Sequence, residues 1–389
     1  MLELAKILRD IDNFGHEHAD GFAGLEDQLT TARNMIREID ADPEGALRKI
    51  ESSKTSWLTA MFSESPQKSF ALPEVPRSHA VVAIDGSQIM ADKHEVAMCY
   101  LINSAGITLF YGCGERPIAV TSPFLGYKNE HLVEIYGGKD VRVDENMVGV
   151  RRTIAEFNQM EGALHKVSEK GLPSVGLFDG SLILWTLQGE PGDYKQRVLS
   201  ECMRSLDLAK ERRIPVAGYV SDPGSRDFVN SLKILLCTAP SVDCDSCQYK
   251  NEPELRPCNA IELLKDSMVF GRKLRDGERS VLFTSSSKIL NDYGEHRILA
   301  FYLNIGQEIV RIEIPAWVAE SPELLALVHS VCYDQARKGR GYPVALSEAH
   351  ERAVVRGADR TAFYEAIERS FVKHGAKITR SMKRLSKGY

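Results

Sequence analysis

The tripeptide Asp-Gly-Ser occurs twice, each time at the end of an apolar run: VVAIDGSQI at 81–89 and VGLFDGSLI at 175–183. Asp-Gly is a common turn dipeptide, because Gly tolerates positive φ and Asp binds nearby amides. Here, however, each pair closes a run apolar enough to be a buried strand, and another apolar stretch follows it. A carboxylate at the end of a buried strand must be paired or bind a cation. We therefore expect Asp85 and Asp179 to carry chemistry.

The two aspartates suggest a cation site if their strands are neighbours in one sheet. Two carboxylates held side by side repel each other unless a divalent cation lies between them. Ligands that are all oxygen suit magnesium or manganese. One or two such ions can activate a water and stabilise a leaving oxygen, which is the equipment for phosphodiester hydrolysis.

Such a site usually needs further ligands, and the sequence offers candidates before and after the second aspartate. Glu156 and Glu161 lie on a predicted helix, where either is also compatible with a solvated position. Tyr342 lies in a Gly-rich turn, and His350 lies on the helix that follows. A lone His on a helix is more often a packing or surface residue, but near a Tyr it could ligate metal or transfer a proton near neutral pH.

Alternating strand and helix patterns predict the elements that position these residues. Residues 1–62 have helical apolar spacing, and 63–78, with three prolines, reads as a linker. A strand at 80–84 and a hairpin of 96–102 and 107–112, turning at 103–106, come next. The later elements are a helix at 148–170 with Phe157, Met160, Leu164 and Val167 on one stripe, a strand at 174–178, a helix ending near Arg213 and a strand at 214–220. This order predicts an α/β fold with a mixed sheet and covering helices.

The last third of the chain again alternates predicted strands and helices, and it ends in a basic tail. The expected elements are strands within 296–305 and 308–318, a helix at 322–338, a loop at 339–343 and a helix at 345–355. The tail, 373–389, could contact phosphates, although a solvated charge run is the commoner explanation.

Composition describes an ordinary water-soluble chain of 389 residues with 43% hydrophobic residues and a net charge of -5. No run reaches the roughly 18 apolar residues of a membrane span. The N-terminus mixes acids and bases and lacks a signal-peptide pattern. We therefore expect a cytoplasmic protein, without a uniformly basic surface.

Four of the eight cysteines are clustered: Cys237, Cys244, Cys247 and Cys258. In a reducing compartment such spacing, with a central C-x-x-C, indicates metal rather than disulfides. The Cys-rich insertion, 237–262, could bind tetrahedral zinc or an iron-sulfur cluster. The alternative is a surface insertion with four reduced thiols.

Five motifs, in order, resemble the NurA nuclease family. They are AIDGS at 83–87, RRTIAEF at 151–157, LFDGSL at 177–182, GYVS at 218–221 and YPxxLxxAH at 342–350. The resemblance spans roughly residues 80–360. It implies an RNase H-like core within a domain at 79–389, a ring-shaped homodimer, and manganese-dependent endonuclease and 5′-to-3′ exonuclease activity on DNA.

The resemblance also implies roles for particular residues and a partner. The acids of the family fall on Asp85, Glu156 and Asp179, with Glu161 competing for the middle position, and its Tyr and His fall on Tyr342 and His350. Family members work with HerA, a hexameric ATPase, in the resection of DNA ends. No Walker-type phosphate loop occurs in this chain, which fits a nuclease served by a separate motor. The helical N-terminal segment could dock that ATPase or simply pack as helices.

Four basic residues are candidates for DNA contacts: Arg151, Arg152, Arg226 and Lys233. Contacts from such residues to phosphates would make binding fall with salt, although surface solvation explains these residues nearly as well. Competing functions are a non-catalytic DNA clamp coupled to an ATPase, and a nuclease acting on RNA or in phage defence. The clamp is disfavoured, because it needs none of the five site residues.

Overall fold

The computed structural model describes residues 3–90 and 98–375, without the side chains of 17–23. The chain divides into two compact units. Unit 1 comprises residues 1–73, 220–290 and 298–313, and unit 2 comprises 74–219, 291–297 and 314–389.

Unit 2 is built on a mixed sheet with the strand order β5-β4-β3-β8-β9. The strands are β3 (His79–Met90), β4 (Tyr100–Tyr111), β5 (Ile118–Gly126), β8 (Ser174–Asp179) and β9 (Val216–Val220). The first three form an antiparallel meander, whereas β8 runs parallel to β3 and β9 runs parallel to β8. This is the RNase H-like arrangement, so the predicted fold class is confirmed.

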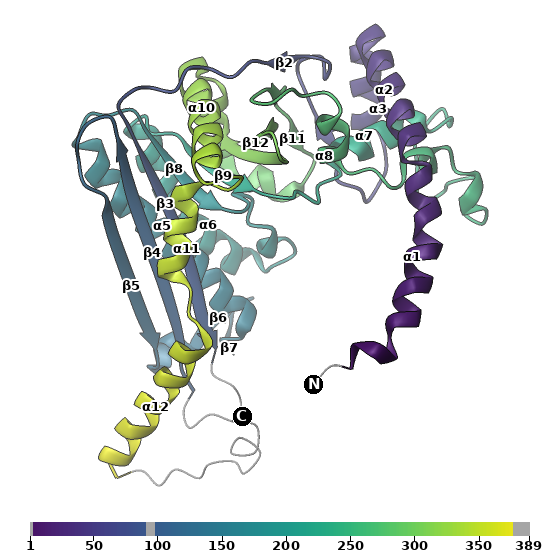
Figure 1. Ribbon diagram of the computed structural model, residues 1–389. Helices are drawn as coiled ribbons and strands as arrows, with labels where there is room; N and C mark the ends of the chain where they lie inside the picture. The colour runs from purple at the N-terminus through teal and green to yellow at the C-terminus, as the bar shows by residue number, and fades with distance from the viewer. Residues whose placement is uncertain (1–2, 91–97, 376–389) are drawn as a thin grey trace. The chain divides into compact units, whose positions relative to one another are not determined.

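Helices cover both faces of this sheet (Figure 1). The helix α5 (Glu145–Ser168) and the helix α11 (Val344–Ala353) both pack on β3 and β4, from opposite sides, and α6 (Gly192–Glu211) packs beside α5. The stripe of α5 predicted to be apolar is buried, at Phe157, Met160, Leu164 and Val167. Asp144 begins this helix by accepting a hydrogen bond from the Met147 amide at 2.9 Å. The apolar period predicted this helix at 148–170, and the Asp144 cap places its start three residues earlier.

The hairpin expected at Asn103–Gly106 is wrong. These four residues lie in the middle of β4, paired with β3 on one side and β5 on the other. Their small size serves close packing, because a Cβ on Gly106 would lie 2.6 Å from the Ile84 side chain. Residue types that favour turns predicted a turn here. In the folded chain the same types serve instead as small side chains in a closely packed strand.

Several elements of unit 2 were not expected from the sequence. They include α4 (Asn129–Leu132), a small hairpin of β6 (Val133–Tyr136) and β7 (Lys139–Arg142), the 3-10 turn η2 (Trp185–Leu187), α9 (Ala316–Ala319) and α12 (Gly357–Lys373). The predicted helix at 322–338 matches α10 (Pro322–Lys338) at both ends. Ser321 begins it by accepting a bond from the Leu324 amide, at 3.4 Å, and Pro322 occupies its first position.

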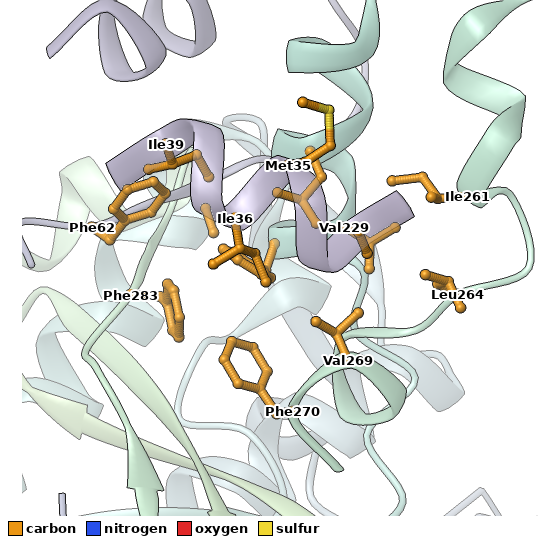
Figure 2. Packing of buried hydrophobic residues seen from close by; sticks show 14 of the residues in the cluster. Met35, Ile36, Ile39, Phe62, Val229, Ile261, Leu264, Val269, Phe270 and Phe283 are labelled. Atoms are coloured by element: carbon orange, nitrogen blue, oxygen red, sulfur yellow. The ribbon is translucent and has the colours of Figure 1, made fainter. Parts of the chain in front are cut away.

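Unit 1 joins the N-terminal helices to a second apolar core (Figure 2). The helices α1 (Leu8–Ala23), α2 (Leu25–Ala41) and α3 (Pro43–Glu51) were predicted as helical. Met35, Ile36 and Ile39 of α2 pack into a cluster with Phe228, Phe270 and Phe283. The other helices of the unit are α7 (Asp227–Leu236) and α8 (Asp266–Gly271), with the 3-10 turns η3 (Pro253–Leu255) and η4 (Pro257–Ile261).

Short and long strands complete unit 1. The order β2-β10-β12-β13 joins β2 (Ser69–Phe70), β10 (Arg279–Ser280), β12 (Ile298–Asn304) and β13 (Ile309–Pro315), and β1 (Ala60–Met61) pairs with β11 (Thr284–Ser285). Hence the expected linker at 63–78 contains a strand, β2, that pairs with β10. In the described part of the chain, no helix is long and apolar enough to cross a membrane. The basic tail lies outside the described residues from position 376 onward.

Candidate active site

Asp85 and Asp179 meet at one place because their strands are parallel neighbours. The pairing of β3 with β8 runs from Ala80 and Ser174 to Ile84 and Phe178, so the next residue of each strand is an aspartate. Ligand atoms of Asp85, Asp179 and His350 all lie within 4.8 Å of one another. We call these three residues the acid-His cluster. A second group of this kind among the described residues is Asp207, Glu295 and His296.

The two Asp-Gly-Ser copies use their glycines differently. The first copy lies inside β3, which continues to Met90, and a Cβ on Gly86 would lie 2.5 Å from Glu156 Oε1 and 2.9 Å from Arg152 Cγ. The second copy ends β8, and Gly180 turns the chain with φ of +103°. One glycine therefore allows a helix to approach, and the other allows the strand to end.

Glu156 reaches the sheet from α5, at the position that Gly86 leaves open. Its Oε1 lies 3.2 Å from Arg152 Nε, one turn earlier on the same helix. Burial raises its pKa to about 7; Arg152 opposes this increase, and the charges of Asp85 and Asp179 add to it. Glu156 is not a member of the acid-His cluster, whose ligand atoms lie within 4.8 Å of one another. Its carboxylate nevertheless interacts electrostatically with Asp85 and Asp179. Of the two glutamates weighed from the sequence, the structure brings Glu156 to the site.

His350 is held against Asp85 by the anchoring of α11. Its Nδ1 lies 2.8 Å from Asp85 Oδ2, and 54% of its side chain is exposed. Asn103 Nδ2 donates to the Ala353 carbonyl at 2.9 Å, and the Ser87 hydroxyl donates to the same oxygen. The last turn of α11 is therefore fixed by polar groups of β3 and β4, on the face that carries Asp85.

Tyr342 lies between α10 and α11 and contacts the second aspartate. Its hydroxyl donates a hydrogen bond to Asp179, and its ring meets Tyr219 edge-on at 5.7 Å. Burial raises the pKa of Asp179, and the bond from Tyr342 opposes that change. Burial and the Asp179 carboxylate raise the pKa of Tyr342, so it remains a neutral donor. As a neutral donor, Tyr342 can orient the Asp179 carboxylate.

These side chains suit a hard divalent cation. Two carboxylates and one imidazole converge, and Glu156 adds a third carboxylate beside them. Carboxylate-rich sites with imidazole accept manganese, and carboxylates alone accept magnesium. Burial is the main cause of the raised pKa of Glu156, and a bound cation would offset the smaller contribution from the charges of Asp85 and Asp179.

The four basic residues predicted to contact DNA lie in different parts of the structure and have different partners. Arg152 pairs with Glu156 at the site. Arg151 points elsewhere: its Nη1 donates to the Tyr100 hydroxyl at 2.5 Å and its Nη2 donates to Glu134 at 2.9 Å, which ties the β6–β7 hairpin to α5. Arg226 and Lys233 belong to unit 1, where Arg226 donates to the Leu264 carbonyl and the buried Lys233 pairs with Glu262. Their contacts with DNA remain predictions.

The clustered cysteines are free, partly buried thiols of unit 1. Burial raises the pKa of Cys258, and the nearby thiols of Cys237 and Cys244 add to the increase, so three of the four are neighbours. Among the described residues, however, neither group with ligand atoms within 4.8 Å contains a cysteine. Metal binding by these residues remains a prediction.

Sequence reasoning missed the residues that position the site. Asn103 was assigned to a turn, although its amide anchors α11. Ser87 belongs to the first motif and lies two residues beyond Asp85 on the same strand, so strand alternation could have indicated its role. No local pattern connects Asn103 to residue 353.

The fold is thus an α/β mixed sheet of RNase H-like strand order, with Asp85 inside its central strand and Asp179 at the end of the parallel neighbour. A family model described as the NurA domain matches residues 79–355. The chain therefore belongs to the NurA family of nucleases.

Solved structures similar to this chain include two of NurA and one of endonuclease V. The NurA nuclease from Sulfolobus solfataricus is 12% identical, with 93% of this chain and 99% of that chain covered and a TM-score of 0.49. A structure of NurA with manganese is 10% identical, covering 88% and 96%, with a TM-score of 0.43. The catalytic domain of human endonuclease V is 12% identical, covering 83% and 94%, with a TM-score of 0.33. No curated protein sequence matched.

Proposed function

We propose that this protein is a DNA nuclease that depends on a divalent cation, manganese or magnesium, and works as an endonuclease and 5′-to-3′ exonuclease. The observation that supports it is the convergence of Asp85, Asp179 and His350, with Glu156 beside them, in a chain of the NurA family. A non-catalytic clamp would have no use for three carboxylates and an imidazole at one point, whose mutual repulsion is unfavourable without a cation.

The chain's own residues would bind and orient the reacting groups. Asp85, Asp179, His350 and Glu156 would hold the cation, which supplies Lewis acidity toward the phosphodiester when bound. Tyr342 fixes the orientation of the Asp179 carboxylate through its hydroxyl. His350, more than half exposed and in contact with Asp85, would either complete this ligand set or exchange a proton with the substrate. In the protein without a cation, burial raises the pKa of Glu156 to about 7.

The biological setting is part of the same proposal. We propose that the protein acts as a homodimer with a HerA-type hexameric ATPase in DNA end resection and repair, in the cytoplasm. Family membership supports this setting, and so does the absence of a phosphate-binding motor motif from the sequence. A role in phage defence would use the same chemistry, and an adjacent gene for a HerA-type ATPase would not separate the two roles.

The first experiment measures cleavage of end-labelled duplex and single-stranded DNA by the purified protein with manganese, magnesium or EDTA. We expect cleavage that requires the cation and falls at least a hundredfold in Asp85→Asn, because a ligand of the cluster is lost. Asp140→Asn, which changes an exposed aspartate of β7 in the same way, should keep wild-type activity.

Two outcomes would contradict the proposal. Cleavage by Asp85→Asn at a wild-type rate would show that the acid-His cluster does not take part in the reaction. If the wild-type protein cuts neither substrate with manganese, alone or with the ATPase added, then the clamp is the correct function.

A further inference from the structure

A cavity of about 660 Å³ borders the candidate active site within unit 2. Its lining includes Arg152, whose Nε lies 3.2 Å from Glu156 Oε1. Gln88 also lines it, two residues beyond Gly86 on β3 and therefore on the same face of the strand. The cavity thus begins where Glu156 reaches the sheet. Its size is within the range of pockets that hold small organic ligands.

Asp85 faces α11 and Gln88 faces α5, so the acid-His cluster and this cavity lie on opposite faces of β3, and they can communicate only past the end of β8. The pairing of β3 with β8 stops at Ile84, and β3 continues to Met90 beyond it. Past Asp179 the chain turns away at Gly180. A strand of nucleic acid with its phosphate at the aspartates would reach the cavity around this side of β3, where β8 no longer pairs with it.

The charges of the lining exclude a phosphate from the cavity itself. Arg152 is the cation of the lining, against the acids Asp144, Glu145 and Glu190. An anionic group would be repelled by this balance, whereas a neutral planar group would not. The part of a nucleotide that fits is therefore the base.

Two acceptor atoms of the lining have no protein partner among the described residues. They are Oε2 of Glu190 and Oε1 of Gln88, both buried. Tyr136 already donates its hydroxyl to Glu190, so one carboxylate oxygen remains for a ligand. Buried acceptors without donors are unfavourable and favour a ligand that presents N–H groups.

Two aromatic rings complete the lining. Tyr136 of the β6–β7 hairpin and Tyr194 of α6 have ring centroids 5.4 Å apart, at an interplanar angle of 56°. The Arg197 guanidinium lies 5.5 Å from the centroid of the Tyr194 ring. Aromatic faces stack on nucleobases with little regard to sequence, so selection must come from the acceptors.

We propose that this cavity, the base pocket, holds the nucleobase beside the scissile phosphate and prefers bases with an exocyclic amino group to thymine. Adenine, cytosine and guanine present an N–H₂ to Glu190 and Gln88, whereas thymine presents carbonyl oxygens on both sides of its single N–H. This inference rests on the proposed nuclease function and names a residue, Glu190, that sets its base preference.

The cleavage test sequences the ends of products from random-sequence single-stranded DNA cut with manganese. We expect thymine to be depleted about fivefold at one position flanking the cut, the size expected for one hydrogen bond. In Glu190→Gln the depletion should be lost, because the amide can donate to a thymine carbonyl. Glu211→Gln, an exposed acid at the end of α6, should keep it. No depletion in the wild type, or the same depletion in Glu190→Gln, would overturn the proposal while leaving the nuclease function intact.

A binding test separates failure of the base pocket from failure of the nuclease. Titration calorimetry with dCMP and dTMP, in EDTA, needs no cleavage. We expect dCMP to bind about fivefold more tightly than dTMP, and the two to bind equally to Glu190→Gln. Equal affinities in the wild-type protein would overturn the base pocket even if cleavage had not been detected.

Discussion

Glu156 is a buried carboxyl group whose protonation is coupled to the fold. Its pKa rises from the ordinary 4.5 to about 7, because burial and the two aspartates disfavour its charged form. A carboxyl with a raised pKa binds its proton more tightly in the folded chain than in the unfolded chain. Its contribution to stability is therefore fully present below about pH 4.5 and is lost as pH rises to about 7.

Glu156→Gln should remove this pH dependence from the cation-free protein. At pH 8, in EDTA, we expect the variant to be more stable than the wild type by about 1 to 3 kcal/mol, because it avoids a buried charge. At pH 4.5 the two should melt together. The measurement is the melting temperature between pH 4.5 and 8.

Glu161→Gln is the matched control, since it removes a carboxylate from the same helix. Its melting temperature should follow the wild type at each pH. If Glu156→Gln and the wild type keep a constant difference from pH 4.5 to 8, then Glu156 is not the group that titrates near 7.

The contact between α5 and β3 depends on a missing side chain. At Gly86, a Cβ would lie 2.5 Å from Glu156 Oε1 and 2.9 Å from Arg152 Cγ. Neither atom can give way without moving the ion pair that joins the two residues. Residue 86 must therefore be glycine because α5 needs the space that a side chain would fill, and not because of the backbone conformation at that position.

Gly86→Ala should harm both stability and activity. We expect a loss of about 1 to 3 kcal/mol from overpacking and at least a tenfold fall in cleavage, because Glu156 is displaced. Gly162→Ala on the same helix meets no atom within 4 Å and should gain about 0.5 to 1 kcal/mol. Urea unfolding and cleavage assays on both variants check this. An active, fully stable Gly86→Ala would show that the space is not needed.

The sequence predicted elements where local and tertiary preferences agree. The stripe of α5 and the bounds of α10 follow from residue patterns. The sequence supports the pairing of the two aspartate strands only as a condition of the cation site, and the structure shows this pairing to be parallel. The turn predicted at Asn103–Gly106 failed, because small polar residues also suit a strand squeezed between a helix and two neighbours. The β6–β7 hairpin, which supplies Tyr136, has too few residues to show a period.

At the scale of the whole molecule, the cysteine cluster lies in the unit that does not contain the acid-His cluster. Cys237 and Cys244 pack against the core of unit 1, and the amide of Cys244 donates to the Lys54 carbonyl at 2.9 Å. The residues between Cys244 and Cys258 include little regular structure apart from η3 and the start of η4. A bound ion would tie this insertion to the core.

We expect the purified protein to contain about one zinc ion per chain, or iron with visible absorbance if a cluster is bound. Cys244→Ser with Cys247→Ser should lose the metal and lower the melting temperature, since metal binding adds to folding energy. Cys113→Ser, an exposed thiol outside the insertion, should change neither. Elemental analysis that finds no zinc or iron in the wild-type protein would leave four reduced thiols.

The acid-His cluster draws its members from positions 85, 179 and 350, and Tyr342 arrives only after α10. During synthesis, the sheet of unit 2 receives both aspartates long before its histidine and tyrosine leave the ribosome. A chain released at residue 340 would carry the β3–β8 pair but neither Tyr342 nor His350. Under the proposed function, cleavage activity would therefore be among the last properties that the growing polypeptide acquires.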